Sequence, residues 1–193
     1  MFAAAERLIR RHGPHVSMAA IAEEAGVTKP TLYREVGAKD ALVHALGARL
    51  DGRVRTVIET AVGAVSGRRN ELRTFVRSSL EAVGADRDIY LFVSAGGTGE
   101  DRLRQALLLA DRTADLLAQR LAEQRVADDA DPSVATAWAY GLVGMLHFVT
   151  LWWLRAPTVT ADELADQLTE LLWSGLQVDE APAANARRRR GQR

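Results

Sequence analysis

At 193 residues, with nearly half of them apolar, the chain can form one domain of ordinary size or a small domain joined to a larger one. It contains no cysteine, which excludes disulfides and thiolate zinc sites and is compatible with a cytoplasmic location. The formal net charge is zero, but residues 1–50 carry seven Lys and Arg against five acids, whereas residues 51–180 carry thirteen against twenty. This distribution excludes a uniformly basic nucleic-acid binder and suits a DNA-binding segment on a domain that avoids DNA.

The first forty residues predict three short helices. Apolar spacing places the first helix over Phe2–Arg11, and a Gly-Pro pair ends it. Ser17 is a good N-cap residue for a second helix, and Gly26 follows that helix where a left-handed turn favours a residue without a Cβ. Thr28 then caps a third helix that has Pro30 close to its start. The second and third helices therefore form a helix-turn-helix unit.

The outer surface of the third predicted helix carries chemistry suited to DNA. Leu32 and Val36 face inward by helical spacing, which leaves hydroxyls, a phenol and two cations outside. Such groups suit phosphates and base edges. The same pattern also fits a small helical domain whose polar face is merely solvated, so spacing alone leaves both interpretations open. The outward residues are Thr28, Lys29, Thr31, Tyr33 and Arg34.

The order of residues in this unit resembles that of a known family. The stretch IAEEAGVTKPTLYREVGAKDAL is similar to the DNA-binding domain of the tetracycline-repressor (TetR) family, in which Ile-Ala, Ala-Gly-Val with Ser or Thr, Leu-Tyr, and Lys with an acid and Leu occur in this order. The resemblance covers about the first fifty residues, and the remainder matches only in length and helical pattern. The matching positions are Ile21, Ala22, Ala25, Gly26, Val27, Thr28, Leu32, Tyr33, Lys39, Asp40 and Leu42.

The resemblance implies a homodimeric transcriptional regulator, usually a repressor, whose recognition helix enters the major groove of each half-site. A two-fold dimer requires a roughly palindromic operator with half-sites about 34–36 Å, or a multiple of that distance, apart. Ser17 and Thr28 are expected to offer hydroxyls and helix-start N–H groups to phosphate oxygens. Tyr33 and Lys39 are expected to contact the DNA backbone. The candidates for base edges are Lys29, Thr31 and Arg34.

The sequence departs from the family pattern inside the third helix. Pro30, which we include among the DNA-binding positions, stands where a small residue is common. Glu35 and Val36 stand where His-Phe is usual. Glu35 would repel phosphates or accept a hydrogen bond from cytosine N4. These departures change the chemistry offered to the bases.

A long amphipathic helix begins at Lys39-Asp40, and its apolar positions continue to Val65. Such a helix of about 27 residues would be roughly 40 Å long, enough to begin beside the DNA-binding unit and end inside a second domain. The resemblance implies that it is the connector between the two domains. Further along, Asn70 is expected to cap the next helix and Asp86 a short helix after it.

Two segments in the middle of the chain are turns between helices. The glycine-rich run Ser94–Gly99 is interpreted as a flexible loop, because no strand precedes it and no Gly-Lys-Ser/Thr follows it. Thr98 and Asp101 are expected to form a capping box for the helix that comes next. The second segment, Asp128-Asp129-Ala130-Asp131, is interpreted as a solvated turn. Asp131 is expected to be an N-cap, with a proline at the first helical position.

Ala135–Leu154 is the most apolar stretch of the chain. A membrane span needs about 20 apolar residues, so a membrane helix is one interpretation. The other interpretation is a buried helix shared between the core and a dimer interface. This interpretation is favoured because the stretch contains polar residues such as His147 and because no second span is present to pack with it. A capping box of Thr160 and Glu163 then starts a last helix, Asp162–Leu176. We expect these two helices to form a four-helix bundle with the partner's copies.

We therefore predict an all-α protein of about nine helices. Residues 1–46 are expected to form a helix-turn-helix DNA-binding domain, residues 47–178 a ligand-binding and dimerisation domain, and residues 179–193 a disordered Arg-rich tail. The ligand is expected to be a largely apolar small molecule in a mostly apolar cavity. Aromatic residues at helical spacing are more often core, but the candidate wall residues are Phe92, Trp138, His147 and Trp152.

No residue pattern supports an enzyme, a cofactor or a metal site. His12 and His15 are separated by Gly-Pro, so they do not share a continuous helix, and no histidine has a second ligand at a recognised spacing. We predict a ligand-responsive repressor that is located in the cytoplasm, on the nucleoid when bound to DNA, and has no membrane partner. The alternative is a helical protein-interaction or membrane-associated module in which the helix-turn-helix is only a packing unit.

Overall fold

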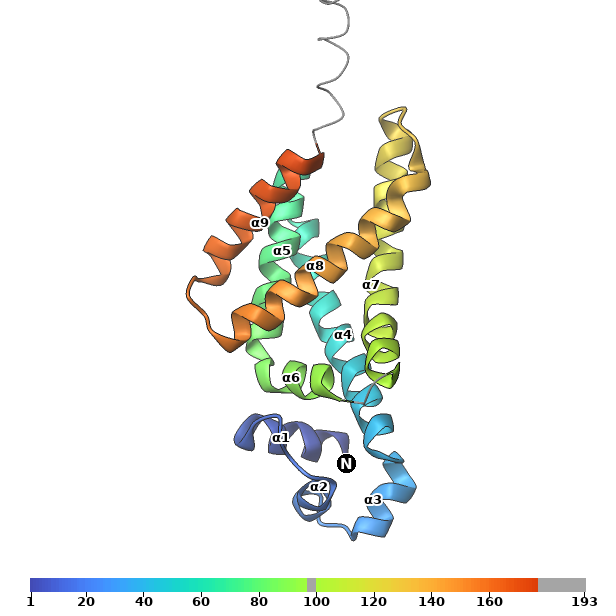
Figure 1. Ribbon diagram of the computed structural model, residues 1–193, viewed down its shortest axis with the longest axis vertical. Coiled ribbons are helices and arrows are strands. Elements are labelled where there is room, and N and C mark those ends of the chain that lie inside the picture. Colours follow the sequence, from blue (N-terminus) through green and yellow to red (C-terminus); the bar gives the residue numbers. More distant parts are fainter. Residues whose placement is uncertain (97–99, 177–193) are drawn as a thin grey trace, which may run out of the picture.

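The structure, a computed structural model, describes residues 1–96 and 100–176. These residues form nine α-helices and one short 3₁₀ helix without a strand, which confirms the predicted all-α fold. Figure 1 shows the first three helices grouped at one end, and the fourth leads from them into a larger helical body. The elements are α1 (Phe2–His12), α2 (Met18–Glu24), α3 (Lys29–Val36), α4 (Lys39–Gly63), α5 (Arg68–Ala85), α6 (Arg87–Ala95), α7 (Glu100–Ala127), η1 (Pro132–Val134), α8 (Ala135–Arg155) and α9 (Ala161–Leu176).

The helix-turn-helix unit is built by the local signals expected from the sequence. Ser17 caps α2 by accepting a hydrogen bond from the Ala20 backbone N at 3.1 Å. Thr28 caps α3 by accepting one from the Thr31 backbone N at 3.3 Å. Gly26, between the two helices, has a φ of 67°, the left-handed conformation that favours glycine. Each such cap stabilises its helix by about 1 kcal/mol, which is substantial for helices of two turns.

The helix α4 belongs to both parts of the molecule. It begins at Lys39, as predicted, and ends at Gly63, slightly before the predicted end. Its first half is buried against α1, α2 and α3 through Leu42, Leu46 and neighbouring residues. It also packs against α5, α6 and α7. The orientation of α4 therefore relates the helix-turn-helix unit to the body.

The helix α6 completes the core of the DNA-binding end. Ile89, Phe92 and Val93 are buried in the same cluster as the apolar residues of α1 to α4. At the end of α6, Gly96 lies so close to α4 that a Cβ there would be 2.6 Å from Cγ1 of Val43. Figure 1 shows α6 lying across the junction beside α1. The two ends of the molecule are thus packed against each other as well as joined by a helix.

Two further hydrophobic clusters hold the body together. One lies between α5 and α9, with partly buried residues of α8 packed against it. The other lies between α7 and α8 and consists of alanines, whose small side chains let the two helices approach closely. The buried members are Val76, Leu80, Leu164, Ala165 and Leu168 in the first cluster and Ala114, Ala118 and Ala139 in the second.

Two of the predicted caps in the body are confirmed. The Thr160 backbone N donates to Glu163 Oε2 at 2.8 Å and the Glu163 backbone N donates to Thr160 Oγ1 at 3.2 Å, which is the predicted capping box of α9. Asp131 accepts a hydrogen bond from the Ser133 backbone N at 2.9 Å. The element that it caps is the 3₁₀ helix Pro132–Val134, which leads directly into α8.

The predicted cap at Asn70 is wrong, and the predicted cap at Asp86 has the right position without a capping hydrogen bond. Gly67 is the N-cap of α5, so Asn70 lies inside the first turn of that helix. Asp86 occupies the N-cap position of α6 but makes no capping hydrogen bond, because arginines of α1 and α4 bind its carboxylate. The predicted cap at Thr98 and the predicted tail, residues 179–193, lie outside the described residues.

Candidate nucleic-acid interface

The helix α3 separates apolar from polar side chains sharply. Leu32 and Val36 are buried under it, with 0% and 9% of their surfaces exposed. The opposite face is open to solvent and carries hydroxyls, cations and the phenol of Tyr33. Thr31 is half-buried, and the remaining predicted contact residues on α3 and its cap are exposed, namely Thr28, Lys29, Pro30, Tyr33 and Arg34.

The start of α3 offers several hydrogen-bonding groups in one place. Thr28 Oγ1 lies 2.9 Å from Thr31 Oγ1, so the two hydroxyls are adjacent. Pro30 has no backbone N–H, and in the first turn that N–H would have no intrahelical partner. The helix dipole also favours an anion at this end. The exposed hydroxyl of Ser17 stands at the start of α2.

The cations on α3 are available for binding. Arg34 Nε lies 3.5 Å from Glu35 Oε1, and both side chains are largely exposed. An exposed ion pair contributes little, about 0–1 kcal/mol, so Arg34 can leave Glu35 for a nucleic-acid group at small cost. Glu35, one of the positions that departs from the family pattern, therefore lies beside Arg34, a predicted base-contact residue.

Lys39 connects the DNA-binding end with α6. Lys39 is the first residue of α4, and its ammonium lies 5.7 Å from the centre of the Phe92 ring of α6. A cation at this distance from an aromatic face is attracted by about 0.5–1 kcal/mol at an exposed site. Lys39, a predicted backbone contact, therefore lies beside a ring of α6 that is buried in the core shared with the DNA-binding helices.

Four charged side chains form a closed ring behind this interface. Glu6 and Arg10 come from α1, Arg53 comes from α4, and Asp86 stands at the corner between α5 and α6. Asp86 Oδ1 accepts from Arg10 Nη2 at 2.8 Å, and Asp86 Oδ2 accepts from Arg53 Nε at 3.0 Å. Arg53 Nη1 also donates to Glu6 Oε1 at 3.1 Å. Arg10 Nη2 lies 3.5 Å from Glu6 Oε2 and closes the ring.

Glu6 is a buried carboxylate that neighbouring arginines keep ionised. Burial acts to raise the pKa of Glu6, but hydrogen bonds and charges of Arg49 and Arg53 outweigh burial and hold this pKa below its ordinary value. Arg49 Nε donates to Glu6 Oε1 at 3.0 Å. A buried carboxylate without such partners is costly by several kcal/mol. The arginines therefore stabilise α1 against α4 in one defined arrangement.

The four predicted ligand-wall residues lie in different parts of the structure. Phe92 is 2% exposed and belongs to the core that α6 shares with the DNA-binding helices. Trp138 is half-buried beneath the guanidinium of an arginine of α7, whose central carbon is 4.7 Å from the ring centre. Trp152 is 51% exposed on the outside of α8. His147 has a polar partner from α6. The four residues are not brought together into one wall.

That partner is Tyr90, which the sequence analysis did not single out. Tyr90 OH and His147 Nδ1 lie 2.5 Å apart, between α6 and α8. Burial lowers the pKa of His147 and raises the pKa of Tyr90, so both side chains are neutral at pH 7. The pair places a hydroxyl and an imidazole side by side between α6 and α8. No local signal links two residues on different helices.

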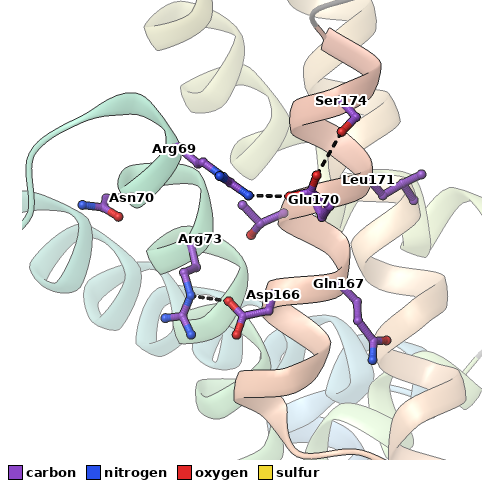
Figure 2. A pocket seen from close by; sticks show the side chains of 9 residues that line it. Arg69, Asn70, Arg73, Asp166, Gln167, Glu170, Leu171 and Ser174 are labelled. Carbon is purple, nitrogen blue, oxygen red and sulfur yellow. Dashed lines mark hydrogen bonds and ion pairs between the residues drawn. The ribbon is translucent and has the colours of Figure 1, made fainter.

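A groove of about 930 Å³ lies between α5 and α9. Figure 2 shows Arg69 directed toward Glu170 and Arg73 toward Asp166 across this groove. Ion pairs face it, and it therefore differs from the apolar ligand cavity expected from the sequence. Its lining residues, which include none of the four predicted wall residues, are Arg69, Asn70, Arg73, Asp166, Gln167, Thr169, Glu170, Leu171 and Ser174.

Comparison with known proteins identifies the family. Residues 2–46 match the family model "Bacterial regulatory proteins, tetR family", and residues 57–188 match "Tetracyclin repressor-like, C-terminal domain". The chain belongs to the TetR family. The resemblance of the helix-turn-helix is thus confirmed, and it extends to a TetR-type second domain that the sequence pattern had matched only in length and helical character.

Individual TetR-family relatives are similar over most of the chain. An uncharacterized HTH-type transcriptional regulator of Mycobacterium tuberculosis is 34% identical over 174 residues, which cover 87% of this chain and 72% of the relative. A TetR-like transcriptional regulator from Rhodococcus sp. RHA1 is 28% identical, with a TM-score of 0.65 and coverage of 92% and 93%. The structure of AibR in complex with isovaleryl coenzyme A and operator DNA is 22% identical, with a TM-score of 0.60 and coverage of 88% and 94%.

Membership of the TetR family fixes the functional class. Its members are DNA-binding transcription factors rather than enzymes, which confirms the predicted class of this chain. The α2–α3 unit is the helix-turn-helix of such a factor. Within the part of the chain that the structure describes, no group of three or more His, Asp and Glu side chains is arranged to hold a metal ion.

The helices α8 and α9 of this TetR-family protein expose large apolar side chains. Phe148 is 72% exposed and Trp152 is 51% exposed, one turn apart on α8, and Leu171 of α9 is 62% exposed. Among the described helices, the segment Pro132–Arg155 is long and apolar enough to cross a membrane, and 17% of its apolar window is buried. Exposed apolar surface of this kind marks an interaction site.

Proposed function

We propose that this TetR-family regulator is a homodimeric repressor that leaves a roughly palindromic operator when a small molecule binds its second domain. The observation that carries the proposal is the face of α3, where hydroxyls, a phenol and cations are exposed above a buried apolar side. DNA binding is assigned to residues 1–46, and ligand binding and dimerisation to residues 47–178. The protein acts in the cytoplasm, on the nucleoid when bound to DNA.

The recognition helix α3 enters the major groove, where its side chains have distinct roles. Base edges are contacted by Lys29, Thr31 and Arg34, because long cationic side chains reach guanine acceptors and hydroxyls suit several bases. Phosphates are contacted by Ser17 and Thr28, whose hydroxyls stand exposed at helix starts. Tyr33 and Lys39 bind the DNA backbone on either side. Pro30 sets the conformation of the first turn of α3.

The dimer forms through Ala135–Leu154 and Asp162–Leu176, which pack with the partner's copies as a four-helix bundle. Support comes from Phe148, Trp152 and Leu171, which lie exposed on these two helices. Burying one large apolar side chain stabilises an association by about 1.5–3 kcal/mol. Trp152 therefore belongs to the dimer interface rather than to a ligand cavity.

The ligand binds inside the body near the pair Tyr90–His147, which offers a hydroxyl and an imidazole between α6 and α8. A largely apolar small molecule with one polar group fits this chemistry. The similar fold of AibR, which was determined with isovaleryl coenzyme A and operator DNA, is compatible with a ligand that carries a short apolar chain. Such a ligand favours a conformation in which the half-site spacing no longer fits the operator.

The test is the affinity of the full-length chain for duplex from upstream of its own gene, measured at several salt concentrations. Log affinity should fall linearly with log salt, with a slope of about −0.9 per phosphate contacted. Tyr33→Ala and Lys39→Ala should weaken binding while the dimer persists. Arg68→Ala is the control, because this exposed cation at the start of α5 pairs with Asp128 directly after α7, and Figure 1 shows these two helix ends far from α3. Unchanged affinity in both test variants would contradict the assigned backbone contacts.

A second candidate function rests on the exposed apolar side of α8. In it, the chain is a helical interaction or membrane-associated module, and the helix-turn-helix serves only in packing. Flotation with phosphatidylcholine vesicles separates the two, because a membrane module would float and a dimeric DNA reader would remain in solution. We favour the dimer because α8 carries His147 and Thr150 on sides that the body covers.

A further inference from the structure

A dimeric DNA reader must hold its two recognition helices at one separation. The second domains define the two-fold axis of the proposed dimer, so the separation depends on how firmly each DNA-binding end is fixed to its own body. In this chain α4 is continuous between the two, and α6 packs against both α1 and α4. Long helices are rarely straight and curve gently around the core they cover. Contacts beside α4 therefore decide its angle.

The apolar part of this joint gives attraction but little direction. Ile89, Phe92 and Val93 of α6 are buried against the DNA-binding helices. The stabilisation that apolar contacts give is roughly proportional to the buried area and has no preferred direction, so small shifts between the packed helices cost little. Gly96 and Val43 set the closest approach of α6 to α4 but do not prevent rotation about that contact.

The charged part of the joint is directional. Asp86 has 15% of its side chain exposed, and its two oxygens face different helices. One oxygen accepts from Arg10 Nε at 3.0 Å and Nη2 at 2.8 Å, and the other accepts from Arg53 Nε at 3.0 Å. Hydrogen bonds from a planar guanidinium to a carboxylate fix both distance and orientation. Glu6 holds the same two arginines from the other side.

We infer that Asp86 is a positioning residue that fixes the DNA-binding end on the body through Arg10 and Arg53, and thereby sets the half-site spacing that the dimer accepts. The inference rests on the proposed homodimeric DNA reader and names the residue that defines its spacing. Asp86 stands at the end of α5 and the start of α6, the corner at which the body meets α1. Asp86 is not among the residues proposed to contact DNA.

The experiment uses the full-length chain and a duplex series. A half-site is first obtained by selection from a random duplex pool, and inverted copies are then placed at spacings that differ by single base pairs. The wild type should lose at least about tenfold in affinity, or about 1.4 kcal/mol, when its best spacing changes by one base pair. Asp86→Asn, which removes the charge and keeps the shape, should reduce that loss to about threefold or less.

Matched variants separate positioning from folding. Asp88→Asn makes the same substitution in the first turn of α6, at a residue paired with its neighbour Arg87, and should keep the wild-type spacing profile. Arg10→Gln should broaden the profile as Asp86→Asn does. Thermal unfolding and dimer mass are measured for every variant. If Asp86→Asn fails to fold, Arg10→Gln, whose side chain is 44% exposed, decides the question.

The outcomes distinguish this inference from the proposed function. A wild type that selects no sequence overturns the proposed function itself. A wild type with a sharp spacing preference that Asp86→Asn and Arg10→Gln leave unchanged overturns the role of Asp86 while the function stands. A uniform loss of affinity at every spacing also overturns it, because that result reports a weaker fold rather than a less fixed joint.

Discussion

The helices α3 and α8 distribute their side chains in opposite ways. On α3 the apolar residues Leu32 and Val36 lie inside and the polar residues outside. On α8 the polar His147 lies inside, hydrogen-bonded to a tyrosine, while Phe148 and Trp152 face outward. Each exposed face predicts its own partner, since cations and hydroxyls suit a phosphate-lined groove and aromatic rings suit a second apolar surface. One chain thus carries two exposed surfaces of different chemistry, one on the helix-turn-helix unit and one on the body.

Breaking the apolar face of α8 should have the largest effect. Phe148→Glu places a charge in the proposed dimer interface, so the protein should become monomeric. A monomer binds only one half-site. Because bivalent binding is lost, the affinity for a palindromic duplex should fall by about 100-fold or more. Light scattering gives the mass, and Val57→Glu on α4, where the side chain is 45% exposed, is the control. A dimeric Phe148→Glu variant with full affinity would contradict the assigned interface.

Breaking the polar face of α3 should have a smaller and more selective effect. Arg34→Ala should cost about 1–3 kcal/mol of binding and relax the preference for one base pair, because a base-edge contact is lost. Lys39→Ala should instead weaken binding to all duplexes alike and reduce the salt slope by about 1. Titrations against duplexes with single base-pair changes measure both effects. Equal loss on every duplex with Arg34→Ala would show that Arg34 contacts only phosphate.

The packed core behind α3 can be tested by adding one carbon atom. A Cβ at Gly96 would clash with Val43, so Gly96→Ala should lower the free energy of unfolding by about 1–3 kcal/mol. Gly52→Ala adds the same atom inside α4, where nothing lies within 4 Å, and should stabilise the protein by about 0.5–1 kcal/mol. Urea unfolding measures the two changes. Equal stability of both variants would contradict the close approach of α6 to α4.

The smallest effect is expected from His147, on the inner side of α8, as a dependence of the free energy of unfolding on pH. Burial lowers the pKa of His147 below 6.5, so below that pH the unfolded chain binds more protons than the folded one. The free energy of unfolding should therefore fall as pH drops from about 6.5 toward the folded-state pKa. Glu6 adds to acid sensitivity only at lower pH, since its pKa lies below 4.5. His147→Gln should flatten the fall between pH 7.5 and 5.5, and an unchanged slope would place the titrating group elsewhere.

Local signals were sufficient to predict the DNA-binding end. Ser17, Gly26 and Thr28 each act within four residues of their own position, so the sequence predicts the helix-turn-helix directly. The same logic places Asp86 correctly at an N-cap but does not predict the partners of its carboxylate. Its partners lie 33 and 76 residues earlier in the chain, and only the packing of α1 and α4 brings them to it.

The body was less predictable for the same physical reason. Helical spacing shows that Phe92 and His147 face inward, but it does not show which element they will meet. Phe92 joins the DNA-binding core and His147 meets Tyr90, a pair separated by 57 residues. The apolar run of α8 allowed both a membrane span and a shared helix, and the fold identifies which of its side chains remain outside.

Selection of duplexes from a random pool by the full-length chain tests the central claim, that this TetR-family protein reads DNA as a two-fold dimer. The claim predicts an enriched sequence with two inverted half-sites, centred about one helical turn of 10–10.5 base pairs or a multiple of it apart. Protein of dimeric mass should remain bound to that sequence. Enrichment of a single asymmetric site, or of no sequence at all, would contradict the claim.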